Sequence, residues 1–367
     1  MPSLCRVQLS AGFTVLAGLF VALGFCHAQE ESKGEKVRFT TVDGVEIHGM
    51  FYAGSKRNAA TVMMLHKLDE DSRKKTWISL AETLNKEGCS VLTFDFRGHG
   101  QSGTIVEPST FWKQPRNLLS VRGGPKKETI EFKDMKPEYY PVLVNDIAAA
   151  KAFLDNRNDT GVCNTGSLMV LGADNGATLG AIWLNAEWHR FAFTPLDPIM
   201  RIPAKIAPTS EGKDVIAAIW LSPTSKLGSR TISISTLLDT PGREYAMPMA
   251  FLYSDEDSMG KSIAKACETR FKGTKKKDDK YRLTVTFPIA GGGKLTGAGL
   301  LQKSLEVDKA IVDYVQGVAE AKGNEWSERD FRKTQYIWRF PPNAPFPAKL
   351  PNEKMLLFDT YERFLPR

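Results

Sequence analysis

The stretch of residues 167–181, SLMVLGADNGATLGA, constrains the fold of this 367-residue chain more than any other. It begins as an apolar run typical of a buried strand and ends in the small and apolar residues of a helix. Gly172 and Gly176 stand two positions either side of Asp174, so the backbone can make a sharp, strained turn that presents Asp174 at the strand end. Because an Asp before a helix is also a good N-cap, a glycine turn with a capping Asp is an alternative interpretation. Both interpretations predict a strand, a tight turn and a helix.

Residues 1–28 have the pattern of a secretory signal peptide. Arg6 precedes an apolar run at 11–25, and small residues lead to the predicted cleavage after Ala28. The sequence therefore predicts export to the periplasm, the cell surface or the medium. An uncleaved anchor is the alternative, although the run is shorter than the ~20 residues that span a bilayer. Lipid modification of Cys26 is a further alternative.

The remaining composition is that of a globular protein, with 42% hydrophobic and 25% charged residues. Once the leader is removed, Cys89, Cys163 and Cys267 remain, too few for a disulfide framework and with no zinc-site spacing. One disulfide is possible, but the sequence does not select its pair. The basic stretch 272–280 carries its own acids and no aromatics, which indicates a solvated loop rather than a nucleic-acid site.

The rest of the chain alternates predicted strands with predicted helices. Residues 37–52 alternate in polarity around Asp43-Gly44, a dipeptide that favours a two-residue hairpin between antiparallel strands. Apolar runs at 60–65 and 89–96 are typical of strands buried on both faces. This order predicts an α/β fold with a doubly wound, mostly parallel sheet and an N-terminal antiparallel hairpin. Further strands are expected at 215–221, 249–253 and 281–289, and helices at 75–86, 139–156, 175–190, 261–271 and 300–319.

Three segments depart from this alternation. Residues 104–136 are rich in Pro, Gly and Lys and are expected to form a long irregular insertion at the carboxyl edge of the sheet. Residues 191–213 hold four prolines, a density that argues against any regular element, and are expected to be irregular and available to cover a pocket. Residues 324–367 are aromatic and Pro-rich and are expected to pack back on the domain, with a partner-binding arm as the alternative.

One order of elements is more specific. Two hairpin strands, a strand ending at His66, a helix, and a strand leading into Asp95-Phe-Arg-Gly-His-Gly-Gln-Ser-Gly103 precede the turn at Asp174. This order resembles the serine aminopeptidase and dienelactone hydrolase end of the α/β-hydrolase superfamily. A Gly-x-Asp-x-Gly turn is similar to that of the haloalkane dehalogenase and epoxide hydrolase branches. The resemblance covers residues 36–319 and implies an α/β-hydrolase fold with Asp174 at the nucleophile elbow.

The resemblance implies a nucleophile, an acid and a histidine, in that chain order. Asp174 takes the first position. Asp257 takes the acid position, with Asp255 as its near neighbour and helix capping as its alternative role. Gly292 occupies the position of the histidine. No imidazole can replace it locally, because the last histidine of the chain is His189.

The missing imidazole limits the chemistry. A hydroxyl nucleophile needs an adjacent base, and an ester formed on Asp174 would need water activated by one. Losing a general base costs about 100- to 10,000-fold in rate. His66, Lys67, Leu68 and Asn175 are expected to line the pocket. His66 is the candidate replacement base, although a loop-structuring role is the favoured interpretation.

The leading hypothesis is an exported α/β-hydrolase-fold protein with a degenerate triad that binds a small molecule, a peptide or a partner without catalysis. The alternative is an active hydrolase with a relocated base, acting on an ester, a peptide or a haloalkane-like substrate. Neither hypothesis calls for a metal or a cofactor, a nucleic-acid partner, or a membrane span after signal cleavage.

Overall fold

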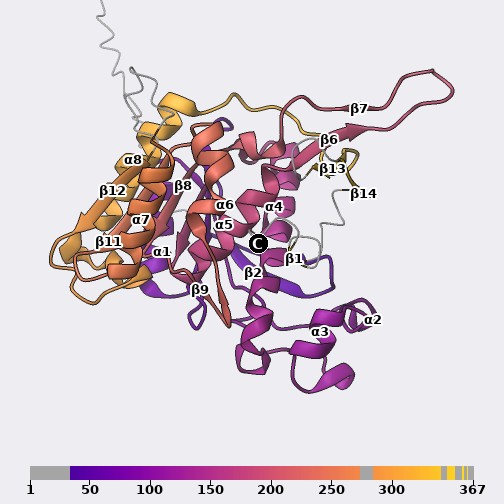
Figure 1. Cartoon of the computed structure of the whole chain (residues 1–367). Coiled ribbons are helices and arrows are strands. Elements are labelled where there is room, and N and C mark those ends of the chain that lie inside the picture. Colours follow the sequence, from indigo (N-terminus) through magenta and orange to yellow (C-terminus); the bar gives the residue numbers. More distant parts are fainter. Residues whose placement is uncertain (1–33, 273–283, 340–344, 352–357, 359–361, 363–367) are drawn as a thin grey trace, which may run out of the picture. The chain divides into compact units, whose positions relative to one another are not determined.

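The computed structural model describes residues 34–272, 284–339 and 345–351, together with Phe358 and Glu362 (Figure 1). The predicted signal peptide, residues 1–28, and nearly all of the basic stretch 272–280 lie outside the described residues. The elements below belong to one unit, residues 32–367. In the described part of the chain, no helix combines the length and apolarity needed to cross a bilayer.

An eight-stranded sheet organises this unit. Its order is β1-β2-β4-β3-β5-β8-β11-β12. The pairs β1–β2 and β2–β4 are antiparallel, and the other neighbours run parallel. The doubly wound, mostly parallel sheet and the N-terminal antiparallel pair are confirmed. The strands are β1 Glu35–Thr40, β2 Glu46–Tyr52, β3 Ala60–Leu65, β4 Ser90–Phe94, β5 Asn164–Ala173, β8 Val215–Leu221, β11 Met249–Ser254 and β12 Thr284–Ile289.

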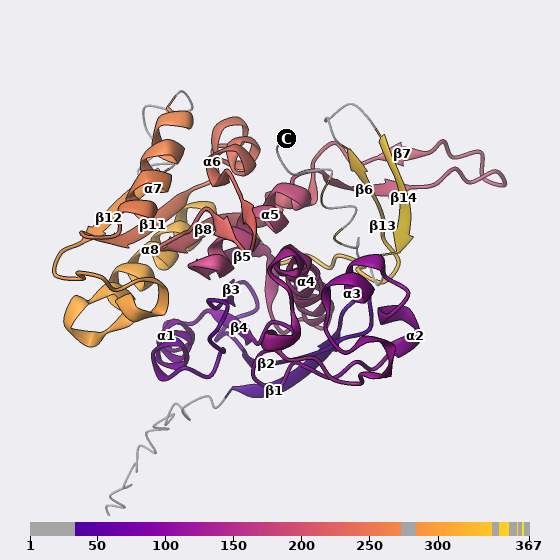
Figure 2. The ribbon, with the colours of Figure 1, turned by 60° about the horizontal axis from the view of Figure 1, so that its bottom comes forward.

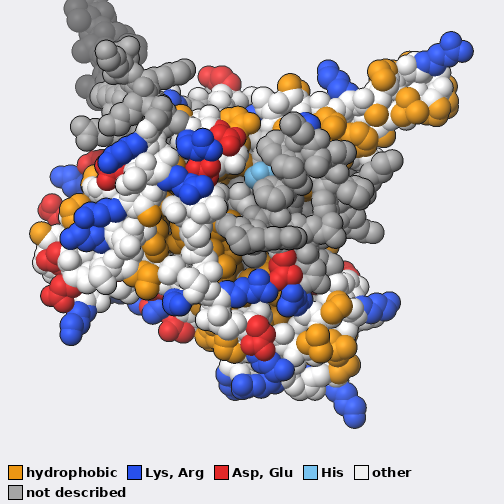
Figure 3. Space-filling view, in the orientation of Figure 1, with side chains coloured by type: hydrophobic (Ala, Val, Ile, Leu, Met, Phe, Trp, Pro, Cys, Tyr) orange, Lys and Arg blue, Asp and Glu red, His pale blue; other side chains and the backbone are white. Residues whose placement is uncertain are grey.

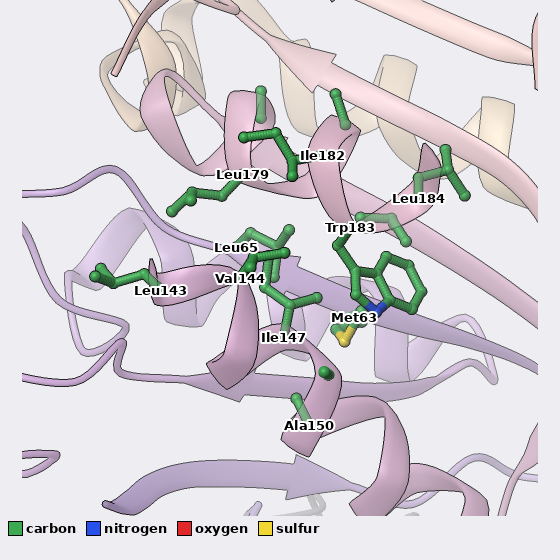
Figure 4. Close-up of a cluster of buried hydrophobic side chains, with 14 of the residues drawn as sticks. Met63, Leu65, Leu143, Val144, Ile147, Ala150, Leu179, Ile182, Trp183 and Leu184 are labelled. Carbon is green, nitrogen blue, oxygen red and sulfur yellow. The ribbon is translucent and has the colours of Figure 1, made fainter. Parts of the chain in front are cut away.

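Helices cover both faces of the sheet because its strands are apolar on both sides. On β3, Met63 and Leu65 point to the face covered by α4 and α5, whereas Val62 and Met64 point to the face covered by α1 and α8. Figure 4 shows Met63 and Leu65 among Ile147 of α4 and Ile182 and Trp183 of α5. The helices are α1 Lys75–Lys86, α2 Pro108–Phe111, α3 Pro115–Ser120, α4 Val144–Asp159, α5 Asn175–Glu187, α6 Ile234–Leu237, α7 Ser258–Arg270 and α8 Val307–Lys322.

The turn between β1 and β2 differs from the predicted two-residue hairpin. Five residues separate the strands, and Gly44 within them has φ +85°. Asp43 is buried and accepts hydrogen bonds from the Arg97 guanidinium. The turn is therefore shaped by a long-range ion pair rather than by hairpin geometry alone.

The prediction that residues 191–213 hold no regular element is wrong. Strands β6 (Arg190–Thr194) and β7 (Lys205–Ile206) lie in a second sheet, β14-β13-β6-β7. Here β6 pairs with β13 (Gln335–Arg339) of the C-terminal extension, and β13 pairs with β14 (Pro345–Pro351). The prolines flank β6 and β7 instead of interrupting them, so the missing hydrogen-bond donors fall outside the ladder.

The described part of the extension lies against the domain. Besides the pairing of β13 with β6, the Trp326 indole Nε1 donates to the Asn158 carbonyl at 3.0 Å. Trp338 is fully buried.

The insertion at 104–136 is more regular than the predicted loop, because it contains the helices α2 and α3.

The three cysteines of the domain are separate and buried. Cys89, Cys163 and Cys267 are all free thiols, so the disulfide left open by the sequence does not form. Burial raises the pKa of Cys89 to about 11 and those of Cys163 and Cys267 to about 12. These thiols stay protonated at neutral pH and are poor nucleophiles.

Candidate functional site

Asp174 stands in a strained backbone turn between β5 and α5. Its φ is 53° and its ψ is −118°, a conformation rare for a residue with a side chain. A Cβ at Gly172 would lie 2.7 Å from the Ala177 Cα, and a Cβ at Gly176 would lie 2.4 Å from the His66 carbonyl oxygen. Both glycines are thus needed for the close approach of strand and helix. The Asp174 side chain makes no N-cap hydrogen bond to the second or third residue of α5, which argues against the capping interpretation of the turn.

Replacing Gly176 with alanine tests this close approach. Because the new methyl group would meet the backbone oxygens of Leu65 and His66, we expect the free energy of unfolding to fall by about 2–3 kcal/mol. The control is Gly299→Ala, whose Cβ would meet only the Leu295 side chain, at 3.5 Å. Urea unfolding of both variants checks the prediction. Equal stability of the two variants would show that the elbow is not tightly packed.

Two of the predicted pocket residues, Lys67 and Asn175, lie close to the Asp174 carboxylate. Burial raises its pKa, and the charges of Asp69 and Asp257 raise it further. The Lys67 ammonium and the backbone N–H of Asn175 act in the opposite direction. The Lys67 Nζ lies 3.6 Å from a carboxylate oxygen of Asp69. Lys67 is therefore near two carboxylates, those of Asp69 and Asp174, at this edge of the sheet.

The loop after β8 closes over the start of α5. The Asn175 side-chain amide donates to the Lys226 carbonyl at 3.2 Å, and the Thr178 hydroxyl donates to the Thr224 carbonyl at 2.5 Å. Leu68 is buried, whereas Lys67 and Asn175 are partly exposed. Asp174 is partly exposed as well, so solvent reaches all three residues.

Asp257, at the predicted acid position, caps a helix. One carboxylate oxygen accepts the Gly260 N–H of α7 at 2.8 Å, as the alternative role requires. The other oxygen, Oδ2, is buried and has no hydrogen-bond partner among the described residues. Asp255 instead accepts the backbone N–H groups of Gly291 and Gly293 and so holds the glycine loop after β12. The charge of Asp257 raises the pKa of Asp174, but neither the His66 nor the His99 ring lies hydrogen-bonded between the two acids.

Gly292, at the predicted histidine position, does not face Asp174. It is buried, and a Cβ there would lie 2.8 Å from the Ser254 Cβ. Among the glycines of this loop, Gly297 lies against the elbow: its Cβ would be 3.6 Å from the Asp174 Cβ. One residue of the loop after β12 that lies against the elbow is therefore a glycine, which has no side chain. Sequence reasoning missed Gly297 because five glycines within 291–299 leave the alignment open.

His66 is held by the backbone on both sides of its ring. Its Nδ1 lies 2.7 Å from the Lys67 carbonyl, to which it donates, and its Nε2 accepts the Phe96 N–H at 3.0 Å. Burial lowers the pKa of His66 to about 4, and neighbouring His99 adds to this effect. His66 is thus a neutral residue that structures the loop, and both nitrogens are turned away from proton transfer at Asp174.

His99 is engaged in the same way as His66. Its Nε2 accepts the Asp69 N–H at 3.3 Å, and its Nδ1 lies 3.0 Å from the Arg97 carbonyl. Burial lowers the pKa of His99 as well.

Within the described ranges, no group of three or more His, Cys, Asp and Glu side chains is arranged to bind a metal ion.

Ser222, a further candidate nucleophile in the sequence, lies beside the elbow in the folded chain. It follows β8 directly beside the elbow, since Leu221 pairs with Ala173 and accepts the Asp174 N–H. Its φ is 46°, and its hydroxyl is buried without a hydrogen-bond partner in the described structure. No local pattern around Ser222 predicts a left-handed backbone at this position.

Comparisons with known proteins identify the fold. The Pf2001 esterase of Pyrococcus furiosus is similar, with a TM-score of 0.50 and 15% identity over 80% of this chain and 92% of that chain. DcsB, solved with a substrate analogue, has a TM-score of 0.50 and 12% identity over 78% of this chain and 100% of that chain. No protein-family model and no curated protein matches the sequence. The chain has the α/β-hydrolase fold, and similarity at these identities extends to the fold alone.

Proposed function

We propose that this protein is exported and binds a small molecule, a peptide or a partner beside Asp174, at the turn between β5 and α5, without catalytic turnover. The observation that carries the proposal is the lack of a side chain on Gly297, which lies beside Asp174 in the loop after β12. The hydrolases that the sequence resembles have their histidine in this loop. Export rests on the leader pattern of residues 1–28.

The chemistry of the site supports binding over hydrolysis. A serine-type hydrolase moves its proton through an imidazole between nucleophile and leaving group. His66 and His99 direct their ring nitrogens at backbone groups, which leaves Asp174 without that relay. The carboxylates of Asp69, Asp174 and Asp257 with the ammonium of Lys67 are instead groups that can orient a polar ligand.

A second candidate function rests on the strained backbone of Asp174. A non-glycine residue at φ 53° costs stability, and such strain concentrates at functional sites. An ionised carboxylate there can attack an alkyl carbon and displace a halide or open an epoxide. This candidate is an α/β hydrolase that acts on esters, peptides or haloalkane-like substrates through a relocated base.

Steady-state assays with aryl esters, and labelling with a fluorophosphonate, distinguish the two functions. We expect neither a burst nor turnover above the buffer rate, and no label, because no base activates a nucleophile or water. Intact-mass spectra after incubation with alkyl halides and epoxides report any ester on Asp174, with Asp174→Asn as the control. A ligand found by thermal shift should lose its effect in Asp174→Lys. Repeated turnover that disappears in Asp174→Asn would overturn the non-catalytic proposal and establish the second function.

A further inference from the structure

The connection between β6 and β7 ends in an exposed apolar tip, which we call the arm tip, residues 195–203. It extends away from the second sheet in both ribbon views (Figures 1 and 2). Ile199 is 90% exposed and Met200 is 70% exposed, and the flanking Leu196 and Ile202 are 61% and 47% exposed. Figure 3 shows hydrophobic side chains along the arm and a basic side chain at its end. Such a concentration of exposed apolar surface marks an interaction site.

The backbone of the arm tip is largely satisfied by its own hydrogen bonds. Asp197 and Ile202 exchange N–H···O bonds at 3.0 and 3.1 Å, which closes the loop between them. The Asp197 carboxylate accepts the N–H groups of Ile199 and Met200, both at 2.9 Å. Three other positions are prolines, which have no N–H. A loop with most of its donors used internally loses fewer hydrogen bonds to water when it enters the interfacial region of a bilayer.

The prolines also argue against a protein strand as the occupant. Strand addition needs a row of free N–H donors along an edge. Pro195, Pro198 and Pro203 break that row within the arm tip, and Pro208 follows β7. The surface that the tip offers is therefore its side chains rather than its backbone.

The charges of the arm match an anionic surface. Arg201 lies at the apex between the apolar residues, and Lys205 is exposed on β7. Asp197 is the acid of the tip, and with Arg201 and Lys205 it leaves residues 195–205 a formal charge of +1. Its carboxylate is turned towards the N–H groups of Ile199 and Met200. The full chain carries a net charge of +7. Arginine and lysine can extend their charged ends to lipid phosphates while neighbouring apolar side chains enter the acyl boundary.

We propose that the arm tip inserts into the interfacial region of an anionic lipid bilayer and holds the protein at a membrane surface. Ile199 and Met200 enter deepest, Leu196 and Ile202 flank them, and Arg201 contacts lipid phosphates. This peripheral attachment needs no spanning helix and is independent of the chemistry at Asp174.

Vesicle flotation tests the proposal. The full chain is mixed with vesicles of phosphatidylcholine alone or of equal parts phosphatidylcholine and phosphatidylglycerol. We expect stronger binding to the anionic vesicles and weaker binding in high salt. Ile199→Ser/Met200→Ser should reduce binding about tenfold or more, because two apolar side chains no longer enter the lipid.

The matched control is Leu118→Ser/Leu119→Ser, which removes two apolar side chains that are 48% and 68% exposed on α3. It should bind vesicles like the wild type, and thermal unfolding should show that all variants are folded. Equal binding by Ile199→Ser/Met200→Ser and the wild type would overturn the proposal. So would a concentration-dependent dimer that the same variant dissociates, with no vesicle binding by the wild type, because a second copy would then be the occupant.

Discussion

Replacing Arg97 with methionine is expected to lower the free energy of unfolding by about 3–5 kcal/mol. The guanidinium is fully buried and binds two carboxylates: Nη1 lies 2.6 Å from Asp43, and Nε lies 2.7 Å from Asp146. It also donates to the Tyr139 hydroxyl at 3.0 Å. Methionine fills much of the same volume but leaves two buried acids without a cation. Urea unfolding at neutral pH measures the loss.

The deficit should depend on pH with a definite sign. Burial opposes ionisation of both acids: the pKa of Asp146 is raised to about 6, while the charge of Arg97 keeps the pKa of Asp43 lowered. Without Arg97 both carboxyls should have raised pKa values in the folded state, so the folded variant binds more protons than the unfolded chain. Its stability should therefore recover as the pH falls from 7 towards the ordinary pKa of Asp, about 4.

The control for Arg97 is Arg243→Met. Arg243 is half exposed and pairs with Asp239 at 2.8 Å, so water replaces the lost interaction and unfolding should change little. Equal stability of Arg97→Met and Arg243→Met at neutral pH would show that the two buried acids find other partners.

The sequence predicts most of the main sheet because its strands are buried on both faces. The apolar runs at 60–65 and 215–221 have the same bounds as β3 and β8. By contrast, β6 depends on β13, whose residues follow it by more than a hundred positions, and local proline content points the other way. The role of Asp43 as the partner of Arg97 was hidden for the same reason: a turn dipeptide carries no sign of a distant guanidinium.

The site could be predicted as far as the types of its residues. Two glycines around Asp174 indicate an elbow, and the lack of any histidine after residue 189 is visible in the chain itself. The contacts between these residues could not be predicted from the sequence. Only the folded loop shows that Gly297 rather than Gly292 contacts the elbow, and only the hydrogen bonds of His66 show that its ring is fully engaged.

Arg329→Met is expected to destabilise the protein by about 3 kcal/mol and to free the C-terminal extension. Arg329 belongs to the extension, and its guanidinium bonds Asp214 and lies 3.6 Å from Glu211 and 3.7 Å from Asp155. Burial raises the pKa of Asp214 to about 6 although Arg329 opposes this, so removal of the cation raises that pKa further. At neutral pH Asp214 must then be buried either as an unpaired charge or as a protonated acid, and both cost free energy. Asp155 keeps Lys151 at 2.5 Å. Urea unfolding and limited proteolysis of residues beyond 324 measure the two effects.

Lys333→Met is the matched control for Arg329, because Lys333 lies on the same extension but is 83% exposed and pairs with nearby Asp330 at 3.1 Å. Its loss should change neither unfolding nor proteolysis. If Arg329→Met unfolds like the wild type while its extension is cut faster, the ion cluster fastens the extension without contributing to the core. If neither property changes, the pairing of β13 with β6 and the buried Trp338 hold the extension alone. The expected joint loss follows from one physical condition: acids buried beneath the extension need the cation that the extension supplies.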